Sequence, residues 1–186
     1  MIRISELKLP LSALPVEVRR AADAPSETDE DRIPPPHPEA ALRQLAAKAL
    51  GIDNSLPASL VDAANHTLQM AQDIRDHLSA VAGKDVRVKL TSGFRCSALN
   101  KAVGSGPSSD HPKAMAMDFR APDFGHPVKV VKELARHVDA LGIGQLILEH
   151  PDTDSPWVHV STRKPTKAIN RVITITADGV FPGVIL

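Results

Sequence analysis

The sequence predicts an α+β fold, in which a small antiparallel sheet packs against helices. Apolar residues at helical spacing come first, between Pro57 and Gly83, and alternation of the strand type begins at Val86. The strand-like runs after Gly144 are joined by short connections, which suit antiparallel pairing better than a doubly wound parallel sheet. We find no internal repeat in the chain.

The composition is that of an ordinary globular protein, long enough for one domain with a hydrophobic core. Of its 186 residues, 42% are hydrophobic and 24% are charged, and 22 basic side chains balance 22 acidic ones. Because the basic residues form no long run either, nucleic acid is not an expected partner. Cys96 is the only cysteine, so an intrachain disulfide and a cysteine-rich zinc site are excluded, and a metal would need histidine and carboxylate ligands.

The sequence gives no sign of a membrane span or a secretory signal. No stretch reaches the roughly 20 apolar residues that cross a bilayer, and the apolar run in the N-terminal MIRISELKLPL is too short for a signal peptide. We therefore expect a protein that is cytoplasmic as synthesised. An endolysin-like protein that leaves through a separate pore to act on the cell wall fits the same expectation, and the sequence leaves the oligomeric state open.

The N-terminal region is expected to be separate from the main domain. Residues 23–39 are first acidic and then proline-rich, with little to bury, as in an extended linker. We predict an arm and linker over 1–37 and a folded domain over 38–186. The domain begins with a helix that has Pro38 in its first turn and Gly51 after its end.

A second helix is predicted from near Pro57 to Gly83. Its apolar residues recur three or four positions apart and form one stripe for the core. The stripe consists of Leu60, Ala64, Leu68, Ala71, Ile74, Leu78 and Val81. His66 and His77 fall off this stripe, so we expect both to face solvent.

Strands dominate the remainder of the chain. Alternation of apolar and charged residues predicts a half-buried strand over 86–90. A short helix within SGFRCSALNKAVG and a longer one from Pro127 to Leu141 interrupt the strands. The other predicted strands are AMAMDFR, QLILEH, WVHVS and RVITITA.

Three side chains in this region form a candidate zinc site. Catalytic zinc usually takes three protein ligands, among which histidine and carboxylate are both acceptable, and leaves a fourth position to water. His111 lies just before one predicted strand, Asp118 follows seven residues later, and His159 alternates with valines in WVHVS. If the two strands are neighbours, the three side chains converge. Taken singly, each histidine could be an exposed or hydrogen-bonded residue, and Asp118 a turn or cap residue.

Four motifs resemble those of the M15 zinc peptidases, the D-Ala-D-Ala carboxypeptidase and murein endopeptidase group, in their small phage and bacterial branch. They are LGIDN, TSGFRCSALNKAVG, SSDHPKAMAMDF, and QLILEH followed by WVHVS. The resemblance spans about residues 51–171 and implies a Hedgehog/D-Ala-D-Ala peptidase-like fold. It implies that His111, Asp118 and His159 bind Zn²⁺. Where the family often has glycine three residues after the first histidine, this chain has Ala114, which fits unless the backbone needs a positive φ.

The resemblance also implies roles around the metal. Glu149, ten residues before His159, matches the glutamate expected as general base, and Asp152 and Asp154 in the intervening loop are alternatives. Arg95 is expected to grip a substrate carboxylate or the developing oxyanion, or else to cap the following helix.

Ser109 and Trp157 are the candidate substrate-binding residues. Ser109 corresponds to the family serine, although a turn serine explains it nearly as well, and Trp157 could equally be a core residue. Cys96 invites a nucleophile hypothesis, but no accompanying His/Asn arrangement supports it, and we expect a small buried side chain. The remaining histidines, His126, His137 and His150, are not needed as ligands.

The sequence thus predicts a zinc metallopeptidase that hydrolyses peptidoglycan stem peptides, as a carboxypeptidase or an endopeptidase. The alternative is a non-catalytic cell-wall-binding or assembly module that retains the fold. Residues in RISELKLPL and HPEAALRQLAAKALGI also resemble the N-terminal segment of predicted FAD-dependent dehydrogenases. No G-x-G-x-x-G joins a strand to a helix, so a dinucleotide fold is not expected. The bond that is cut and the phage or cellular origin remain open.

Overall fold

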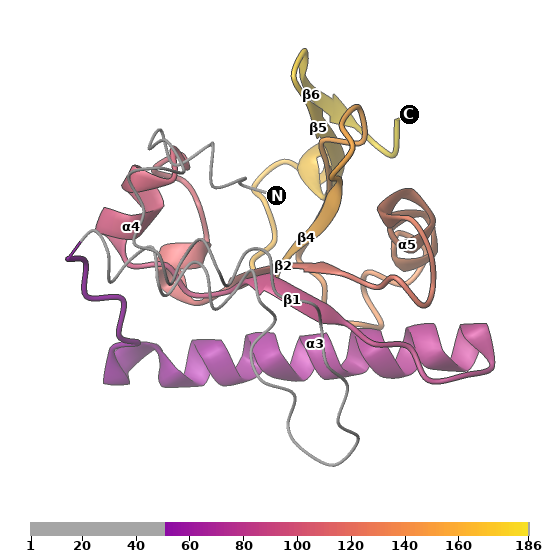
Figure 1. Ribbon diagram of the computed structural model, residues 1–186, viewed down its shortest axis with the longest axis horizontal. Helices are drawn as coiled ribbons and strands as arrows, with labels where there is room; N and C mark the ends of the chain where they lie inside the picture. Colours follow the sequence, from indigo (N-terminus) through magenta and orange to yellow (C-terminus); the bar gives the residue numbers. More distant parts are fainter. Residues whose placement is uncertain (1–50, 186) are drawn as a thin grey trace, which may run out of the picture.

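The observed architecture is α+β, as predicted, in a computed structural model that describes residues 51–185 (Figure 1). The strands of its single sheet are β1 (Lys89–Ser92), β2 (Ala116–Arg120), β3 (Gln145–Glu149), β4 (Trp157–Ser161), β5 (Val172–Thr176) and β6 (Gly179–Pro182). The helices are α3 (Val61–Ala82), α4 (Ser97–Ala102) and α5 (Pro127–Leu134), with short 3₁₀ turns η3 (Ala58–Leu60), η4 (His111–Lys113) and η5 (Ala168–Asn170). The arm and linker predicted over 1–37 and the helix predicted to start at Pro38 lie outside the described residues.

The sheet is mostly antiparallel, in the order β1-β2-β4-β3-β5-β6. The pair of β3 and β5 is parallel, with Leu146 opposite Val172, so the expectation of antiparallel pairing after Gly144 is wrong at this pair. The reason is that β4 already occupies one side of β3. The connection that contains η5 therefore carries the chain to the other side, where β5 runs in the same direction as β3. Strand β6, which the sequence analysis did not predict, then pairs with β5.

Helix α3 begins and ends close to the predicted residues, but its buried face differs from the predicted stripe. Gly83 follows its last residue in the left-handed conformation, with φ 64°, which costs glycine least. The buried side chains are Thr67, Met70, Ile74 and Leu78. Leu68 and Val81, which were expected in the core, are 55% and 51% exposed. The buried stripe is rotated towards Thr67, whose hydroxyl has a buried hydrogen-bond partner in the carbonyl of Ala114.

Two further elements differ from their predicted bounds. Strand β1 starts three residues later than the alternation suggested, because side chains satisfy the earlier backbone amides: Ser79 accepts from the N–H of Val86 and Asp123 from that of Arg87. Helix α5 ends at Leu134, and turns carry the chain on to Leu141, where the helix was predicted to end. Within these turns the N–H of His137 donates to the carbonyl of Leu134 at 2.9 Å.

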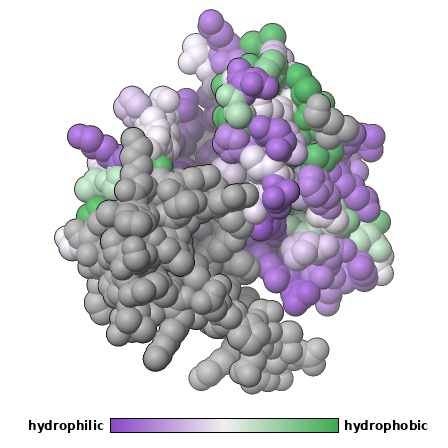
Figure 2. Space-filling model, turned by 45° about the horizontal axis from the view of Figure 1, so that its top comes forward, coloured by the Kyte–Doolittle hydropathy of each residue, from purple (hydrophilic) through white to green (hydrophobic). Residues whose placement is uncertain are grey.

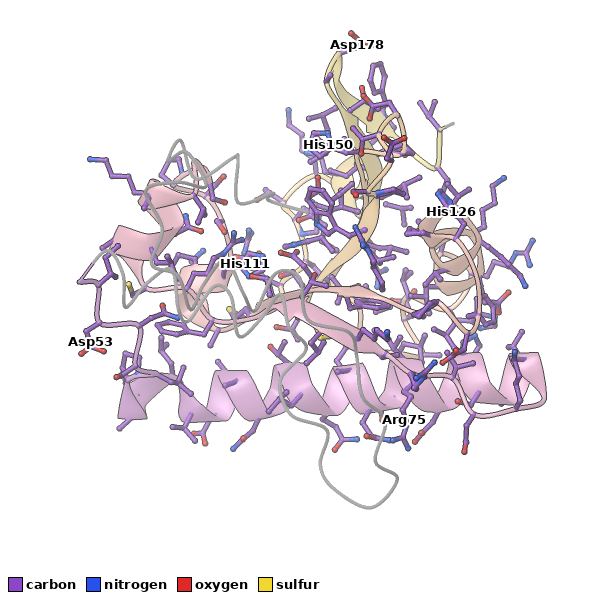
Figure 3. All side chains as sticks on the ribbon, viewed as in Figure 1. Asp53, Arg75, His111, His126, His150 and Asp178 are labelled. Carbon is purple, nitrogen blue, oxygen red and sulfur yellow. The ribbon has the colours of Figure 1, made fainter. Side chains whose placement is uncertain are left out.

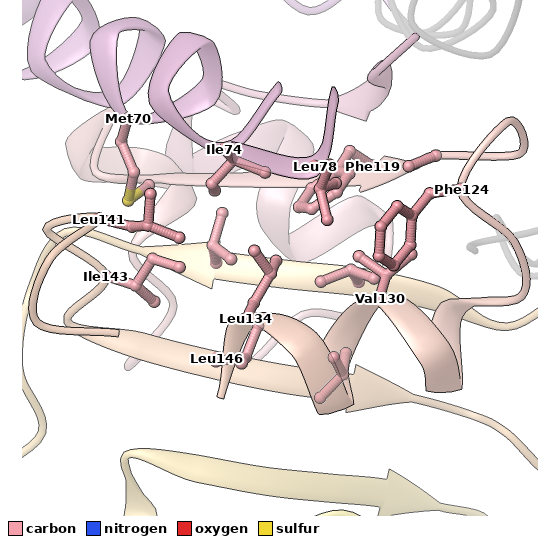
Figure 4. Close-up of a cluster of buried hydrophobic side chains, with 14 of the residues drawn as sticks. Met70, Ile74, Leu78, Phe119, Phe124, Val130, Leu134, Leu141, Ile143 and Leu146 are labelled. Carbon is pink, nitrogen blue, oxygen red and sulfur yellow. The ribbon is translucent and has the colours of Figure 1, made fainter. Parts of the chain in front are cut away.

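The hydrophobic core lies between one face of the sheet and helices α3 and α5 (Figure 4). The strand residues that face it alternate along β2, β3 and β4, as expected of half-buried strands. They are Met117, Phe119, Leu146, Leu148, Val158 and Val160. Because successive strand side chains point to opposite faces, Asp118, Glu149 and His159 lie on the other side of the sheet.

The open end of the β3–β4 hairpin is held by a close backbone approach. The N–H of Gly144 donates to the carbonyl of Ser161 at 2.8 Å. A Cβ added at Gly144 would lie 2.5 Å from the carbonyl oxygen of Thr162 and 2.5 Å from the carbonyl carbon of Arg163. Only glycine fits at this position without moving the chain.

On the face that Figure 2 shows, hydrophilic side chains cover most of the described surface, and apolar ones gather towards one edge. Among residues 51–185, no helix is both long enough and apolar enough to cross a bilayer.

Helix α3 is tied to the segment before β2 by a buried polar contact. The hydroxyl of Thr67 lies 2.8 Å from the carbonyl oxygen of Ala114 and 3.0 Å from that of Ala63, and we assign its single proton to the shorter contact. Ala114 follows η4, so this bond fixes the turn that carries His111.

Replacing Thr67 by valine keeps the shape of the side chain and leaves the buried carbonyl of Ala114 without this donor. We expect the free energy of unfolding of Thr67→Val to fall by about 1–3 kcal/mol, measured by urea denaturation of the full chain. Asn65→Ala, on the exposed face of the same helix, is the control and should change it by less than about 0.5 kcal/mol. Equal midpoints for wild type and Thr67→Val would contradict this role.

Candidate metal centre

His111, Asp118 and His159 meet at one point beside the sheet. Asp118 and His159 are direct Cα partners across β2 and β4, and Nδ1 of His159 lies 2.8 Å from Oδ1 of Asp118. Nε2 of His111 lies 3.3 Å from the same oxygen, and the two imidazole rings are 5.1 Å apart in an edge-to-face arrangement. Figure 3 shows His111 beside the sheet, on the side of α4. This buried group could bind a metal ion.

His111 is oriented for ligation by its other ring nitrogen. Nδ1 lies 2.7 Å from the carbonyl oxygen of Gly93, an acceptor only, so we place the proton on Nδ1. Nε2 then presents its lone pair to Asp118, and this buried nitrogen has no hydrogen-bond partner. Two acceptors that face each other at 3.3 Å repel unless a proton or a metal cation lies between them. The donor set therefore fits a metal ion, with the histidine and carboxylate ligands that zinc accepts.

The electrostatics keep two of the three groups in the ligating form. Burial lowers the pKa of His111 to about 4, although the charge of Asp118 acts in the opposite direction, so this imidazole is neutral at pH 7. Burial acts to raise the pKa of Asp118, but the two imidazoles hold it well below its usual range. For His159, burial acts to lower the pKa, but the hydrogen bond to Asp118 outweighs it and the pKa is raised.

The turn that presents His111 has a backbone conformation unusual for its residue. Ala114 ends η4 with φ 55°, in the left-handed region. The backbone therefore does need a positive φ at this position, and alanine is strained there relative to glycine by roughly 1–2 kcal/mol. Ala114 is only 3% exposed, and the packing of its methyl group offsets part of this strain.

Glu149 ends β3 on the same face of the sheet as His159. Its Cα partner on β4 is Trp157, two residues from His159. Burial raises the pKa of Glu149 to about 7, and the charges of His159 and Asp118 also act on this carboxyl. Asp152 and Asp154, the alternatives, are exposed in the loop, where Asp152 accepts a hydrogen bond from the N–H of Ala177.

The structure also brings Arg95 close to this group. The residue is 4% exposed, and its backbone N–H donates to the carbonyl of His111 at 3.3 Å. Its positive charge acts to lower the pKa of both His111 and Glu149.

The two candidate substrate-binding residues are placed differently. The hydroxyl of Ser109 accepts a hydrogen bond from the N–H of His111 at 3.3 Å, which is the turn contact considered as its alternative. Trp157 is 9% exposed and packs against His150, with ring centroids 5.3 Å apart. Cys96 is half-buried, and its sulfur accepts from the N–H of Leu99 at the start of α4.

Asp110 is a supporting residue that the sequence analysis did not identify. It is 4% exposed, and its carboxylate accepts from Nε of Arg163 at 2.6 Å, from Oγ of Ser161 at 2.9 Å and from Nζ of Lys113 at 3.2 Å. Burial acts to raise the pKa of Asp110, but these hydrogen bonds, that of Arg163 foremost, lower it. Asp110 thus joins the turn of His111 to the end of β4, the strand of His159. Its position directly before His111 was the only signal in the sequence.

Asn54 supports Arg95 in a similar way. Its side-chain oxygen accepts from the N–H of Cys96 at 2.7 Å, and its side-chain nitrogen donates to the carbonyl of Phe94 at 3.4 Å. The two bonds hold the residues directly before and after Arg95 in the chain. Asn54 is the asparagine of the LGIDN motif, for which the sequence alone indicates no role.

Comparison with known proteins gives one family match. The model of the family described as peptidase M15 matches residues 38–161, two thirds of the chain, and this range includes His111, Asp118, Glu149 and His159. No curated protein matches.

Replacing Asp110 by asparagine should loosen the turn that holds His111, because a neutral amide binds Arg163 and Lys113 more weakly than a carboxylate does. We expect the metal affinity of Asp110→Asn to fall about tenfold, measured by competition with a chromophoric zinc chelator. Lys113→Ala is the control, since it removes only the half-exposed partner of the same carboxylate, and should leave the affinity within about twofold. Unchanged affinity in Asp110→Asn would show that the turn is held by other contacts.

Proposed function

The chain belongs to the peptidase M15 family, and from this premise we propose that it is a zinc-dependent metallopeptidase acting on the stem peptides of peptidoglycan. The observation that carries the proposal is the meeting of His111, Asp118 and His159 around one carboxylate oxygen, at 3.3 Å and 2.8 Å. We propose residues 38–186 as the peptidase domain and 1–37 as an arm and linker, since the family match also begins at residue 38.

These three side chains would hold the zinc ion and leave a fourth position to solvent. Bound zinc would supply Lewis-acid chemistry, lowering the pKa of a water molecule towards ~7 and polarising the scissile carbonyl. The chain itself prepares the ligands: Gly93 fixes the tautomer of His111, and the sheet register fixes Asp118 against His159.

We propose Glu149 as the general base. A carboxylate that takes a proton from the attacking water and returns it to the leaving amine works best with a pKa near the working pH. Burial raises the pKa of Glu149 to about 7, and the side chain shares the face of His159. The exposed Asp152 and Asp154 lack this environment.

We propose that Arg95 positions the substrate. Its buried guanidinium would bind the free carboxylate of a terminal D-Ala in a carboxypeptidase, or the developing oxyanion in an endopeptidase. Trp157 would provide an apolar wall on the same face, and Ser109 would add a hydrogen bond to the substrate while holding its turn. The proposed place of action is the cell wall, reached after release from the cytoplasm.

The three ligands can be tested by metal content. We expect the full chain to retain about one zinc per molecule after dialysis, and His159→Ala or His111→Ala to lose it, measured by elemental mass spectrometry. His66→Ala is the control, because this exposed histidine lies on α3. Retention of the zinc by both ligand variants would contradict the assignment.

Catalysis is separated from mere binding by Glu149→Gln. We expect this variant to keep its zinc and to lose about 10²–10⁴-fold in kcat on defined muropeptides, followed by mass spectrometry. Asp152→Asn, a loop carboxylate of the same connection, is the control and should retain wild-type turnover. A non-catalytic wall-binding module would instead bind the muropeptides without cleaving them, in wild type and Glu149→Gln alike. The cleaved bond distinguishes carboxypeptidase from endopeptidase.

A further inference from the structure

A second group of two histidines and one carboxylate lies between α3 and α5. His77 comes from α3, Glu133 from α5, and His137 from the turn that follows α5. Nε2 of His77 lies 3.0 Å from Oε1 of Glu133, and Nε2 of His137 lies 3.3 Å from the same oxygen. The two imidazole rings are 4.5 Å apart. The prediction that His77 simply faces solvent is therefore wrong, since its side chain is only 20% exposed.

The separations between these atoms suit a shared ion. Donors at ~2.0–2.1 Å from a tetrahedral zinc lie about 3.3 Å from one another. The values of 3.0 and 3.3 Å here are close to those of the first centre, at 2.8 and 3.3 Å. Each residue offers one ligand atom, and all of these atoms lie within 4.8 Å of one another. The same chemical set thus recurs at a second place in the described chain.

The two oxygens of Glu133 are used differently. Oε1 faces both imidazoles, whereas Oε2 lies 3.6 Å from Nη1 of Arg136. Two hydrogen bonds from imidazole N–H groups to Oε1 would explain the geometry without an ion, and a metal would explain it with both Nε2 atoms deprotonated. The side chains of Glu133 and His137 are 16% and 42% exposed, so water can reach the group and complete the coordination.

The surroundings select the kind of ion. Two imidazole nitrogens and a single carboxylate suit first-row transition metals, whereas calcium and magnesium need more oxygen ligands. Glu133 also lines a cavity of about 990 Å³ beside the end of α3, which gives access from solvent. Lysines and an arginine in the cavity wall, Lys84, Lys129, Lys132 and Arg136, would weaken the binding of any cation. We therefore expect this group to bind a metal ion more weakly than His111, Asp118 and His159 do.

We infer that His77, Glu133 and His137 form a second binding site for a divalent transition metal, zinc foremost, which links α3 to α5. Both helices pack on the core face of the sheet, whereas Asp118 and His159 lie on the opposite face, so the second site is separate from the first. An ion bound there joins two elements that are far apart in sequence, and binding only to the folded chain raises its stability. The site is a structural clamp that acts independently of the proposed peptidase activity.

The test is a metal titration of the full chain after chelator treatment, with zinc or cobalt(II) alone as the probe. We expect two equivalents in wild type, the second at least tenfold weaker, and one in His77→Gln, which keeps the tighter equivalent. Cobalt(II) should add a second set of visible absorption bands in wild type that His77→Gln lacks. His66→Ala, an exposed histidine on the same helix, is the matched control and should bind two equivalents.

Stability provides an independent reading. Zinc beyond the first equivalent should raise the Tm of wild type but not that of His77→Gln, and in His159→Ala, which keeps only the second site, the first equivalent should already raise the Tm. Persistence of the effect in His159→Ala separates this site from the proposed catalytic centre. If His77→Gln folds poorly without metal, His137→Gln tests the same site from the turn after α5, and zinc beyond the first equivalent should not raise its Tm either. Binding of a single equivalent by wild type, or an unchanged second equivalent in both glutamine variants, would overturn the inference.

Discussion

The pairing of Asp118 with His159 across β2 and β4 is the constraint on which the candidate centre depends. Strand side chains alternate between faces, so the register that sets these two residues opposite each other also places Phe119 and Val158 in the core. A slip of one residue would expose the apolar side chains and bury the charged ones. Core packing thus secures the position of two polar side chains that would be costly to bury alone.

The third side chain reaches the centre through a set of polar tethers. His111 stands on a turn outside the sheet, and three contacts from different elements hold that turn: Thr67 of α3, Gly93 after β1, and Asp110 with its partners near the end of β4. Each bond is modest in net free energy, but each would leave a buried polar group unpaired if broken. Opening the turn would therefore cost free energy, which suits a candidate metal ligand that lies outside the strand pairing.

Local patterns allowed much of this arrangement to be predicted. The alternation in WVHVS predicted strand β4 and the face of His159, and Pro57 and Gly83 predicted approximately where α3 begins and ends, because these signals depend on neighbouring residues alone. The parallel pairing of β3 with β5 could not be predicted in this way, since it depends on which side of β3 was already occupied. Likewise, Leu68 was expected inside because nothing in the helix itself reveals that Thr67 has a buried partner. Asp110 and His77 were missed for the same reason: their partners Arg163 and Glu133 are more than fifty residues away.

The tight contact at Gly144 has a consequence for how the domain tolerates change. A single methyl group there would act as a wedge at the mouth of the β3–β4 hairpin, against the backbone of Thr162 and Arg163. The displacement would travel along Arg163 to Asp110 and from there to the imidazole of His111. Gly144, which has no side chain, is therefore connected through backbone and polar contacts to the candidate metal centre, and a substitution there would strain both the hairpin and the turn of His111.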